Sequence, residues 1–301
     1  MIAAVVLLGQ VLSALVSEGP ALPYGIAAHA GGVVRGVPVV AGGSSWSADK
    51  TKKQWRRETF WFVEGKWKPG PPLPTPRSDL AYASDHTGLY VAGGTDVQAA
   101  TREVLRLSDV GPEASWQKLP DLPAVVESAA GAILDGHLYV AGGQKSNRLW
   151  AFDGSQWQRR APLPGGERAY AALVAHGDAL YLFGGLQGTN VFSDAHRYDP
   201  KQDQWQRLTG FNLPGFGWSA VSVDDAHVML AGRIDQKNQI TDDIWLLNMP
   251  DLSVAAIGKL RVQSCCLPAV NIGANTWWFI GGEPNVQRSR TPRISVVQLE
   301  R

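Results

Sequence analysis

Short apolar runs that end in a glycine pair recur along the whole chain. The six copies cover residues 40–43, 91–94, 140–143, 182–185, 230–233 and 279–282, with Arg233 in place of the second glycine in the fifth copy. The first glycines of successive copies lie 51, 49, 42, 48 and 49 residues apart. This is the period of a repeat in which each unit is one four-stranded propeller blade of the kelch type. The pattern therefore predicts a single array of six blades.

The third repeat shows the strands of one blade most clearly. Apolar stretches predict four strands, at 128–134, 137–141, 149–152 and 157–163. The small residues of the first stretch suit an innermost strand, where the blades converge on the axis. Asp135-Gly136 is typical of a tight hairpin turn between the first two strands. Trp67, Trp116 and Trp157 recur on the outer strands and are expected to pack between blades.

The sixth repeat offers three strands, at 266–272, 276–280 and 294–299, and therefore lacks an outer one. Val16 lies six residues before Leu22-Pro23, the interval that separates Trp67, Trp116 and Trp157 from the Leu-Pro that follows each of them. We expect the N-terminal segment to supply the missing strand, which removes an exposed sheet edge. The predicted fold is all-β: a six-bladed kelch-type β-propeller, closed by an N-terminal outer strand, over residues 14–301.

The N-terminal segment allows a second interpretation. Residues 2–16 are apolar and uncharged, like the apolar region of a secretory signal, although no Lys or Arg precedes them. A signal segment over residues 1–13, cut after Ser13, would leave the closing strand intact. That interpretation predicts a periplasmic or secreted protein, whereas an N-terminus retained as a strand predicts a cytoplasmic one.

Composition narrows the range of partners. The net charge is +1, which gives no electrostatic basis for binding nucleic acid or an anionic membrane. The two cysteines, Cys265 and Cys266, are adjacent and form no disulfide framework or zinc-ligand spacing. The histidines show no metal-ligand spacing either, so we expect no cofactor and no metal. The expected partner is a small molecule, with no nucleic acid and no membrane span; a protein partner stays open.

One mouth of the central channel gathers the candidate chemistry. In an antiparallel blade the loop after each glycine pair lies on the same face as the connections between blades. Glu283 directly follows a glycine pair, and Arg288 and Arg290 follow it in the same loop. A carboxylate in a partly dry mouth can act as a general acid or base, and an arginine can bind a carboxylate. The alternative is an exposed ion pair of little consequence.

Four further residues begin inner strands at this mouth. Arg77 and Arg168 occupy equivalent positions, and Glu127 and Trp218 begin two other blades. Each is a candidate substrate contact, but the arginines would equally suit ion pairs with a neighbouring loop. The long loop after Gly43 is rich in Lys, Arg and Trp. It would either bind an acidic sugar or partner, or form a solvated flap.

The segment 24–32, followed by 39–43, resembles the N-acetylneuraminate mutarotase (epimerase) family. The chain is most similar to its cyclically permuted branch, because the motif Gly281-Gly282-Glu283 falls in the last blade and is followed by Arg290-Thr291-Pro292. The resemblance implies an isomerase that interconverts the α and β anomers of sialic acid. It also implies that Glu283 accepts a proton and that Arg290 belongs to the active site.

The same motif departs from the family in its spacing. The family pattern has Pro-Gly between the glutamate and the arginine, with the arginine six residues after the glutamate. Here Arg290 comes seven residues after Glu283 and the Pro-Gly is absent, so Arg288 is an alternative for the arginine role. Two other functions stay open: a non-catalytic kelch propeller that binds a protein or glycan, and a copper radical oxidase on a similar propeller. Four of the six histidines, His86, His137, His176 and His227, lie at or beside hairpin turns, which we expect on the opposite face, the hairpin face; this argues against the copper site.

Overall fold

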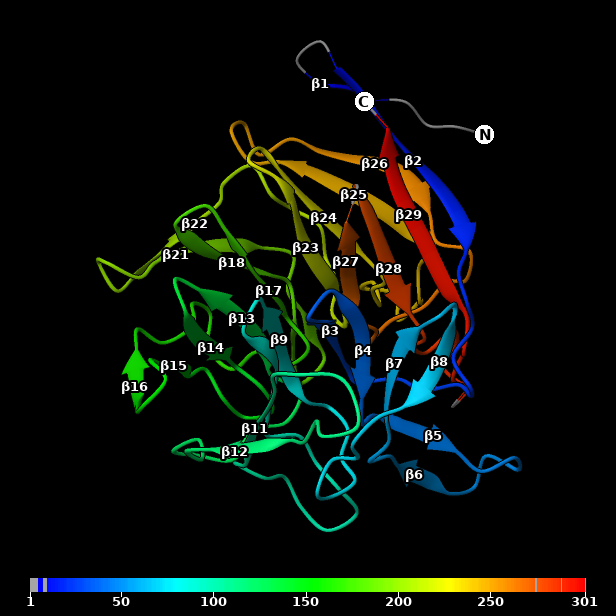
Figure 1. Cartoon of the computed structure of the whole chain (residues 1–301). Helices are drawn as coiled ribbons and strands as arrows, with labels where there is room; N and C mark the ends of the chain where they lie inside the picture. The colour runs from blue at the N-terminus through cyan, green and yellow to red at the C-terminus, as the bar shows by residue number, and fades with distance from the viewer. Residues whose placement is uncertain (1–4, 8–9, 274, 288, 301) are drawn as a thin grey trace.

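The computed structural model describes residues 5–7, 10–273, 275–287 and 289–300. Their strands form six antiparallel sheets arranged as blades around a central axis (Figure 1). The predicted six-bladed β-propeller is thereby confirmed. Within the described ranges no helix is present, so none could cross a membrane.

Each blade runs from an innermost to an outermost strand in sheet order. Blade 1 consists of β3 (Ala30–Val34), β4 (Val37–Ala41), β7 (Thr59–Val63) and β8 (Lys66–Pro69). Blade 2 consists of β9 (Ala81–Asp85), β10 (Gly88–Ala92), β11 (Val104–Leu107) and β12 (Gln117–Leu119). Blade 3 consists of β13 (Ala130–Leu134), β14 (His137–Ala141), β15 (Leu149–Phe152) and β16 (Trp157–Arg160).

The second half of the chain repeats this order. Blade 4 consists of β17 (Ala172–His176), β18 (Ala179–Phe183), β21 (Ala195–Asp199) and β22 (Gln204–Arg207). Blade 5 consists of β23 (Ser219–Asp224), β24 (His227–Ala231), β25 (Asp243–Asn248) and β26 (Val254–Lys259). Blade 6 consists of β27 (Ala269–Gly273), β28 (Thr276–Ile280), β29 (Ile294–Glu300) and β2 (Gln10–Glu18), and β1 (Val5–Leu7) continues its sheet.

The N-terminal strand closes the propeller, as predicted. β2 pairs with β29 in antiparallel register, from Ser13 opposite Glu300 to Glu18 opposite Ser295. Figure 1 shows the two strands side by side at the edge of blade 6. Because the two ends of the chain share one sheet, blade 6 has no unpaired edge at β29. The predicted signal segment falls partly on residues that the structure does not describe, and it stays a prediction.

A ring of six backbone hydrogen bonds surrounds the channel mouth. Its members, which we call the axial ring, are Ala28, Asp79, Ser128, Tyr170, Gly217 and Cys266. Each backbone amide donates to the carbonyl of the ring residue in the preceding blade, over 2.8–3.0 Å. All six residues have φ between 53° and 70°, a region that non-glycine residues rarely adopt. Inner strands therefore begin after this turn: β13 starts at Ala130, although the sequence predicts a strand from Ser128.

The glycine pairs join neighbouring blades. The amide of Gly43 donates to the carbonyl of Arg77 in the next blade, and Gly143 donates in the same way to Arg168. A Cβ on Gly43 would lie 2.6 Å from the Cβ of His29, and its φ is 92°. Glycine recurs here because neighbouring atoms leave no room for a side chain and because φ is positive, in the left-handed region.

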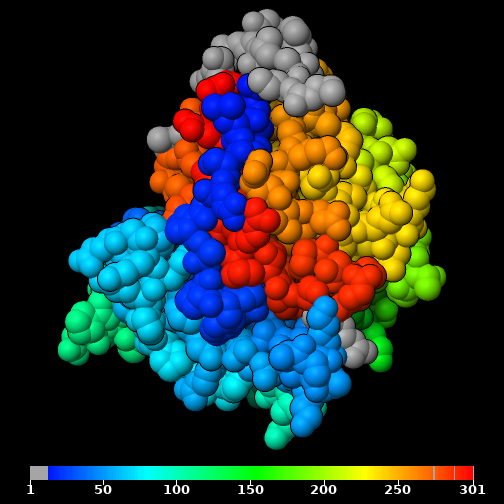
Figure 2. Space-filling model, turned by 90° about the vertical axis from the view of Figure 1, so that its right-hand side faces the viewer, coloured from blue at the N-terminus to red at the C-terminus, as the bar shows by residue number. Residues whose placement is uncertain are grey.

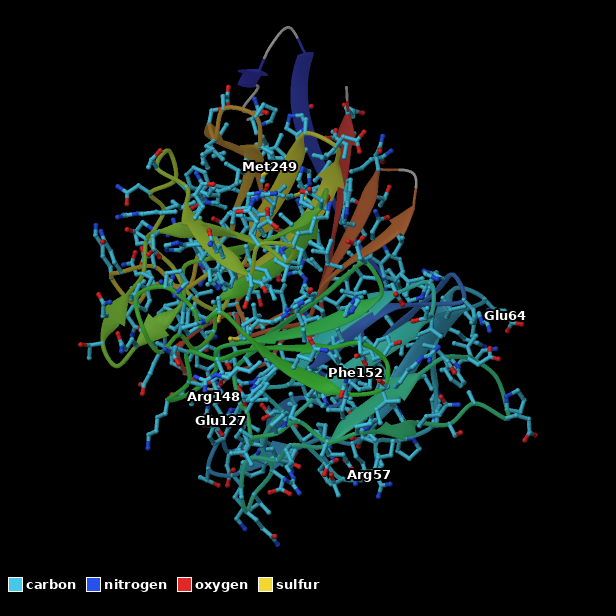
Figure 3. All side chains as sticks on the ribbon, turned by 90° about the vertical axis from the view of Figure 1, so that its left-hand side faces the viewer. Arg57, Glu64, Glu127, Arg148, Phe152 and Met249 are labelled. Atoms are coloured by element: carbon cyan, nitrogen blue, oxygen red, sulfur yellow. The ribbon has the colours of Figure 1, made fainter. Side chains whose placement is uncertain are left out.

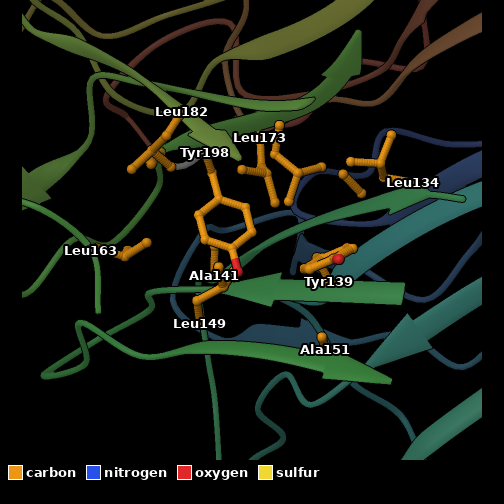
Figure 4. Packing of buried hydrophobic residues seen from close by; sticks show 12 residues of the cluster. Leu134, Tyr139, Ala141, Leu149, Ala151, Leu163, Leu173, Leu182 and Tyr198 are labelled. Carbon is orange, nitrogen blue, oxygen red and sulfur yellow. The ribbon is translucent and has the colours of Figure 1, made fainter. Parts of the chain in front are cut away.

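The spaces between blades form the core. Figure 4 shows one of them, where Tyr139 and Leu149 of blade 3 face Leu182 and Tyr198 of blade 4. The outer-strand tryptophans also bridge the blades. The indole N–H groups of Trp67, Trp116 and Trp157 donate to the carbonyls of Pro20, Pro71 and Pro120, each over 2.9 Å. The prediction that these tryptophans pack between blades is confirmed.

The long loop of blade 1 folds into a hairpin that projects from the propeller (Figure 1). It contains β5 (Ser44–Trp46) and β6 (Lys53–Trp55), which pair in antiparallel fashion. We call residues 44–56 the flap. A shorter pair, β19 (Leu186–Gln187) and β20 (Asn190–Val191), occupies the corresponding loop of blade 4.

Candidate active site

Glu283 and Arg290 form an ion pair at the channel mouth. Arg290 Nη2 lies 2.9 Å from Glu283 Oε1, and the side chains are 8% and 28% exposed, respectively. The backbone of Glu283 exchanges two hydrogen bonds with Cys265, the neighbour of Cys266 in the axial ring. Glu283 and Arg290 thus lie together at this mouth, and their catalytic roles stay predictions.

Backbone contacts hold the arginine in place. The amide of Thr291 donates to the carbonyl of Gly282 over 3.0 Å, so the loop returns to the glycine pair that precedes Glu283. A Cβ on Gly25 would lie 2.3 Å from the Arg290 carbonyl oxygen. The absence of a side chain at Gly25 thus allows the Arg290 backbone to approach blade 1. Arg290 Nη1 also donates to the Ser289 carbonyl over 2.8 Å.

Burial raises the pKa of the Glu283 carboxyl above its ordinary value. The Arg290 guanidinium opposes this shift and Asp79 adds to it, but burial has the largest effect. A carboxylate that is partly desolvated and held by one guanidinium is a stronger proton acceptor than an exposed one. Glu283 is therefore suited to general acid–base chemistry at a pH nearer to neutrality.

Asp79 and Tyr170 of the axial ring belong to the same mouth, and the sequence analysis missed both. The Tyr170 hydroxyl lies 3.4 Å from Asp79 Oδ1, and Lys53 Nζ of the flap lies 3.4 Å from Asp79 Oδ2. Burial, followed by the charge of Asp79, raises the pKa of Tyr170, so its hydroxyl stays protonated. One sequence signal could have found them: Asp79 and Tyr170 lie two positions after Arg77 and Arg168, which occupy equivalent positions in their blades.

The axial ring lines a cavity of about 140 Å³. Tyr82, Gly131 and Leu173 line both this cavity and a wider one of about 680 Å³ towards the hairpin face. His29 also borders the narrow cavity; burial lowers its pKa to about 3, so the ring is neutral at ordinary pH. In the described ranges, no three His, Cys, Asp or Glu side chains group as metal ligands.

Arg168 and Arg77 lie away from this pair, each in a buried ion pair of its own blade. Arg168 is fully buried, and its Nη1 lies 2.6 Å from Asp194 Oδ1. Its guanidinium also donates to the carbonyls of Gly184 and Pro164. Arg77 is 2% exposed and pairs with Glu103. The geometry favours the ion-pair alternative for both arginines, and their substrate-binding role stays a prediction.

The Asp194 carboxylate differs from Glu283 in its electrostatics. Burial alone would raise the pKa of Asp194, but hydrogen bonds from His196 and Arg168 outweigh burial and hold this pKa well below its ordinary range. His196 Nε2 lies 2.9 Å from Asp194 Oδ2. Asp194 is thus fixed as an anion and has no tendency to take up a proton near neutral pH.

The remaining predicted site residues are dispersed. Glu127, labelled in Figure 3, is half-buried, and its backbone carbonyl accepts a hydrogen bond from the amide of Gln144, next to the glycine pair of blade 3. Trp218 is 7% exposed and packs in the core of blades 4 and 5, beside the narrow cavity. Arg288 lies outside the described residues. The substrate-binding roles of all three stay predictions.

Comparison with known proteins finds similarity to one family over part of the chain. A family model described as N-acetylneuraminate epimerase matches residues 119–249. The N-acetylneuraminate epimerase of Yersinia enterocolitica is 33% identical over 138 residues, which is 42% of this chain and 35% of the relative. That of Haemophilus influenzae (strain PittEE) is 33% identical over 129 residues, or 40% of this chain and 34% of the relative.

The relative from Pasteurella multocida is 26% identical over 170 residues, 53% of this chain and 43% of the relative. The chain thus spans less than half the length of these curated relatives. The segment matched by the family model holds blades 3 and 4 and strands β23 to β25, and does not reach Glu283 or Arg290. Over that segment the chain is similar to the N-acetylneuraminate epimerases, in agreement with the family resemblance expected from the sequence.

Proposed function

We propose that the protein is a sugar mutarotase, which interconverts the anomers of N-acetylneuraminate or a related acidic sugar. The observation that carries the proposal is the Glu283–Arg290 pair, held beside the axial ring with the carboxyl pKa raised by burial. The relatives named N-acetylneuraminate epimerase support the substrate class.

In the proposed mechanism, the Glu283 carboxylate removes the proton of the anomeric hydroxyl. The electron pair of that O–H bond forms the carbonyl group, and the bond between the anomeric carbon and the ring oxygen breaks. The ring oxygen takes up a proton from a donor at the mouth, for which Lys53 and Tyr170 are candidates. Rotation of the open-chain ketone and reversal of these steps give the other anomer, with no net change in protons.

Arg290 has two roles in this scheme. It keeps Glu283 ionised in a partly dry site, and it offers N–H groups to a substrate carboxylate. Acid–base assistance of this kind typically contributes about 10²–10⁴-fold in rate. Such a contribution would make anomer exchange with the protein present faster than the spontaneous reaction.

The test is anomer exchange of N-acetylneuraminate, followed by NMR with and without protein. Wild-type protein should accelerate exchange, Glu283→Gln should not, and Glu113→Gln, a change at an exposed glutamate of a surface loop, should behave as wild type. An unchanged spontaneous rate with wild-type protein would reject the proposal. Sugar binding without acceleration would instead support a non-catalytic propeller that binds a glycan.

A further inference from the structure

A third cavity lies next to Arg290, between the flap and the loop that carries Ser289. Its volume is about 310 Å³, and the lining residues that matter here are Tyr24, Trp46, Lys50, Arg56, Ser289 and Arg290. In Figure 2 the blue atoms of the flap lie directly against the red atoms of the C-terminal loop. We call this cavity the flap pocket. A pocket of this size matches the lower end of the range for small-molecule sites.

The charged residues that line the flap pocket are all cationic. Lys50, Arg56 and Arg290 line it, and no Asp or Glu is among its lining residues. Two carboxylates act on these cations from outside: Glu283 pairs with Arg290, and Glu58 lies 3.7 Å from Arg56 Nη1. Lys50 Nζ donates to the Ser289 hydroxyl over 3.1 Å. Cationic side chains from both the flap and the loop of Arg290 therefore line the flap pocket, which favours an anionic ligand.

Arg56 is held in a fixed orientation. Its Nε donates to Ser45 Oγ and its Nη2 to Gln54 Oε1, both over 2.8 Å. Its guanidinium carbon lies 4.7 Å from the centre of the Tyr24 ring, a cation–π contact. Burial raises the pKa of Tyr24 to about 12, so the ring keeps a neutral hydroxyl. A guanidinium that is already oriented loses less entropy on binding a carboxylate.

Arg290 links the flap pocket to the candidate catalytic carboxylate. It lines the pocket and also lies 2.9 Å from Glu283 Oε1. In a 2-keto sugar acid the carboxylate is bonded directly to the anomeric carbon. A carboxylate bound between Arg56 and Arg290 would therefore bring the anomeric hydroxyl towards Glu283. In a sugar whose carboxylate is at the other end of the ring, binding of the carboxylate at this site would not bring the anomeric hydroxyl towards Glu283.

We propose that the flap pocket binds the carboxylate of a 2-keto sugar acid, with Arg56 as the specificity-determining residue. This inference rests on the proposed function for the orientation of the sugar. The carboxylate site itself is tested by binding alone. The flap is thus assigned to ligand recognition, in preference to a solvated loop.

Calorimetry with N-acetylneuraminate and with its methyl ester, which lacks the negative charge, tests the proposal. Wild-type protein should bind the acid about 10- to 100-fold more tightly than the ester, the effect of a charge-assisted pair. Arg56→Met should remove that preference, and Arg56→Lys should restore part of it. Arg57→Met is the matched control, because Arg57 follows Arg56, is exposed and does not line the pocket (Figure 3).

Equal affinity of wild-type protein for the acid and the ester would overturn the proposal, and so would no binding of the acid. Equal losses of affinity for the acid in Arg56→Met and Arg57→Met would also overturn it. Lys50→Met, at another cationic residue that lines the flap pocket, should also weaken binding of the acid. Anomer exchange measured on the same samples separates the two claims. Binding that depends on Arg56 without acceleration of exchange would refute the mutarotase and keep the carboxylate site. Acceleration of exchange by wild-type protein, with no preference for the acid over the ester, would keep the mutarotase and refute the carboxylate site.

Discussion

Two arginine–carboxylate pairs on the glycine-pair face of the propeller have similar lengths and opposite surroundings. Arg168 and Asp194 lie 2.6 Å apart, and Arg290 and Glu283 lie 2.9 Å apart. The Asp194 carboxylate accepts hydrogen bonds from both Arg168 and His196, and these lower its pKa. Glu283 contacts one guanidinium, is partly exposed, and has a pKa raised by burial.

The comparison shows what separates a structural pair from a candidate catalytic pair. A carboxylate saturated by donors stays ionised and joins parts of the blade. A carboxylate that is desolvated but only singly paired keeps the capacity to accept a proton. Residue type alone does not separate the two cases, because both are arginine–carboxylate pairs, whereas the number and geometry of the donors do.

Loss of catalysis in Glu283→Gln is the largest effect expected. The variant keeps the size of the side chain but cannot accept a proton, so the acceleration of anomer exchange should fall by about 10²–10⁴-fold. The measurement is the NMR exchange rate at saturating sugar. Acceleration equal to that of wild type would remove Glu283 from the mechanism.

Loss of stability in Asp194→Asn should be the next largest effect. The change leaves the fully buried Arg168 guanidinium without its counter-charge, which should cost about 3–5 kcal/mol of unfolding free energy. Urea denaturation followed by tryptophan fluorescence measures it. Glu283→Gln, studied in parallel, should cost clearly less, because its site is partly open to water. Equal losses of unfolding free energy in the two variants would contradict the distinction between a structural pair and a candidate catalytic pair.

The two pairs should respond to acid in different pH ranges. The native pKa of Asp194 is depressed, so its stabilisation is present above the unfolded pKa, about 3.9, and is lost only as pH falls through the lower native value. The native pKa of Glu283 is raised above 4.5, so the proton-accepting form is lost at a higher pH. On acidification, catalysis should therefore fall before the contribution of Asp194 to stability does. Parallel pH profiles of exchange rate and denaturation midpoint test this order, and the reverse order would contradict it.

The smallest effect expected is that of Trp157→Phe, at a blade interface remote from both pairs. The change removes one hydrogen bond, from the indole N–H to the Pro120 carbonyl, and should cost about 0.5–1.5 kcal/mol. Thermal unfolding measures it, and the exchange rate of the folded protein should stay at the wild-type value. A large loss of exchange would mean that blade packing controls the mouth.

Most of the fold follows from the sequence, because the repeat constrains every blade in the same way. The glycine pairs, the outer-strand tryptophans and the N-terminal closing strand are set by this repetition. The loop that holds Glu283 and Arg290 could also be identified from the sequence, but the choice between Arg288 and Arg290 as the partner of Glu283 could not. Arg77 and Arg168 have acidic partners that both lie 26 residues downstream, at Glu103 and Asp194, and this shared interval was a sequence signal that the analysis did not use.

Other parts of the site could not be found from patterns of residue type. The axial ring is defined by backbone geometry, and its side chains differ from blade to blade, so Asp79 and Tyr170 do not recur as a motif. The contacts of the flap depend on how a projecting hairpin folds back towards a loop more than two hundred residues later in the chain. Such long-range placement is fixed by tertiary packing, on which local sequence has little influence.

The most direct test of the account is the anomer-exchange rate per folded molecule of Asp194→Asn and Glu283→Gln, measured together at a temperature where circular dichroism shows both folded. The account predicts that Asp194→Asn, although less stable, exchanges N-acetylneuraminate at close to the wild-type rate, and that Glu283→Gln gives only the spontaneous rate. Full activity in Glu283→Gln, or equal loss in both variants, would contradict it.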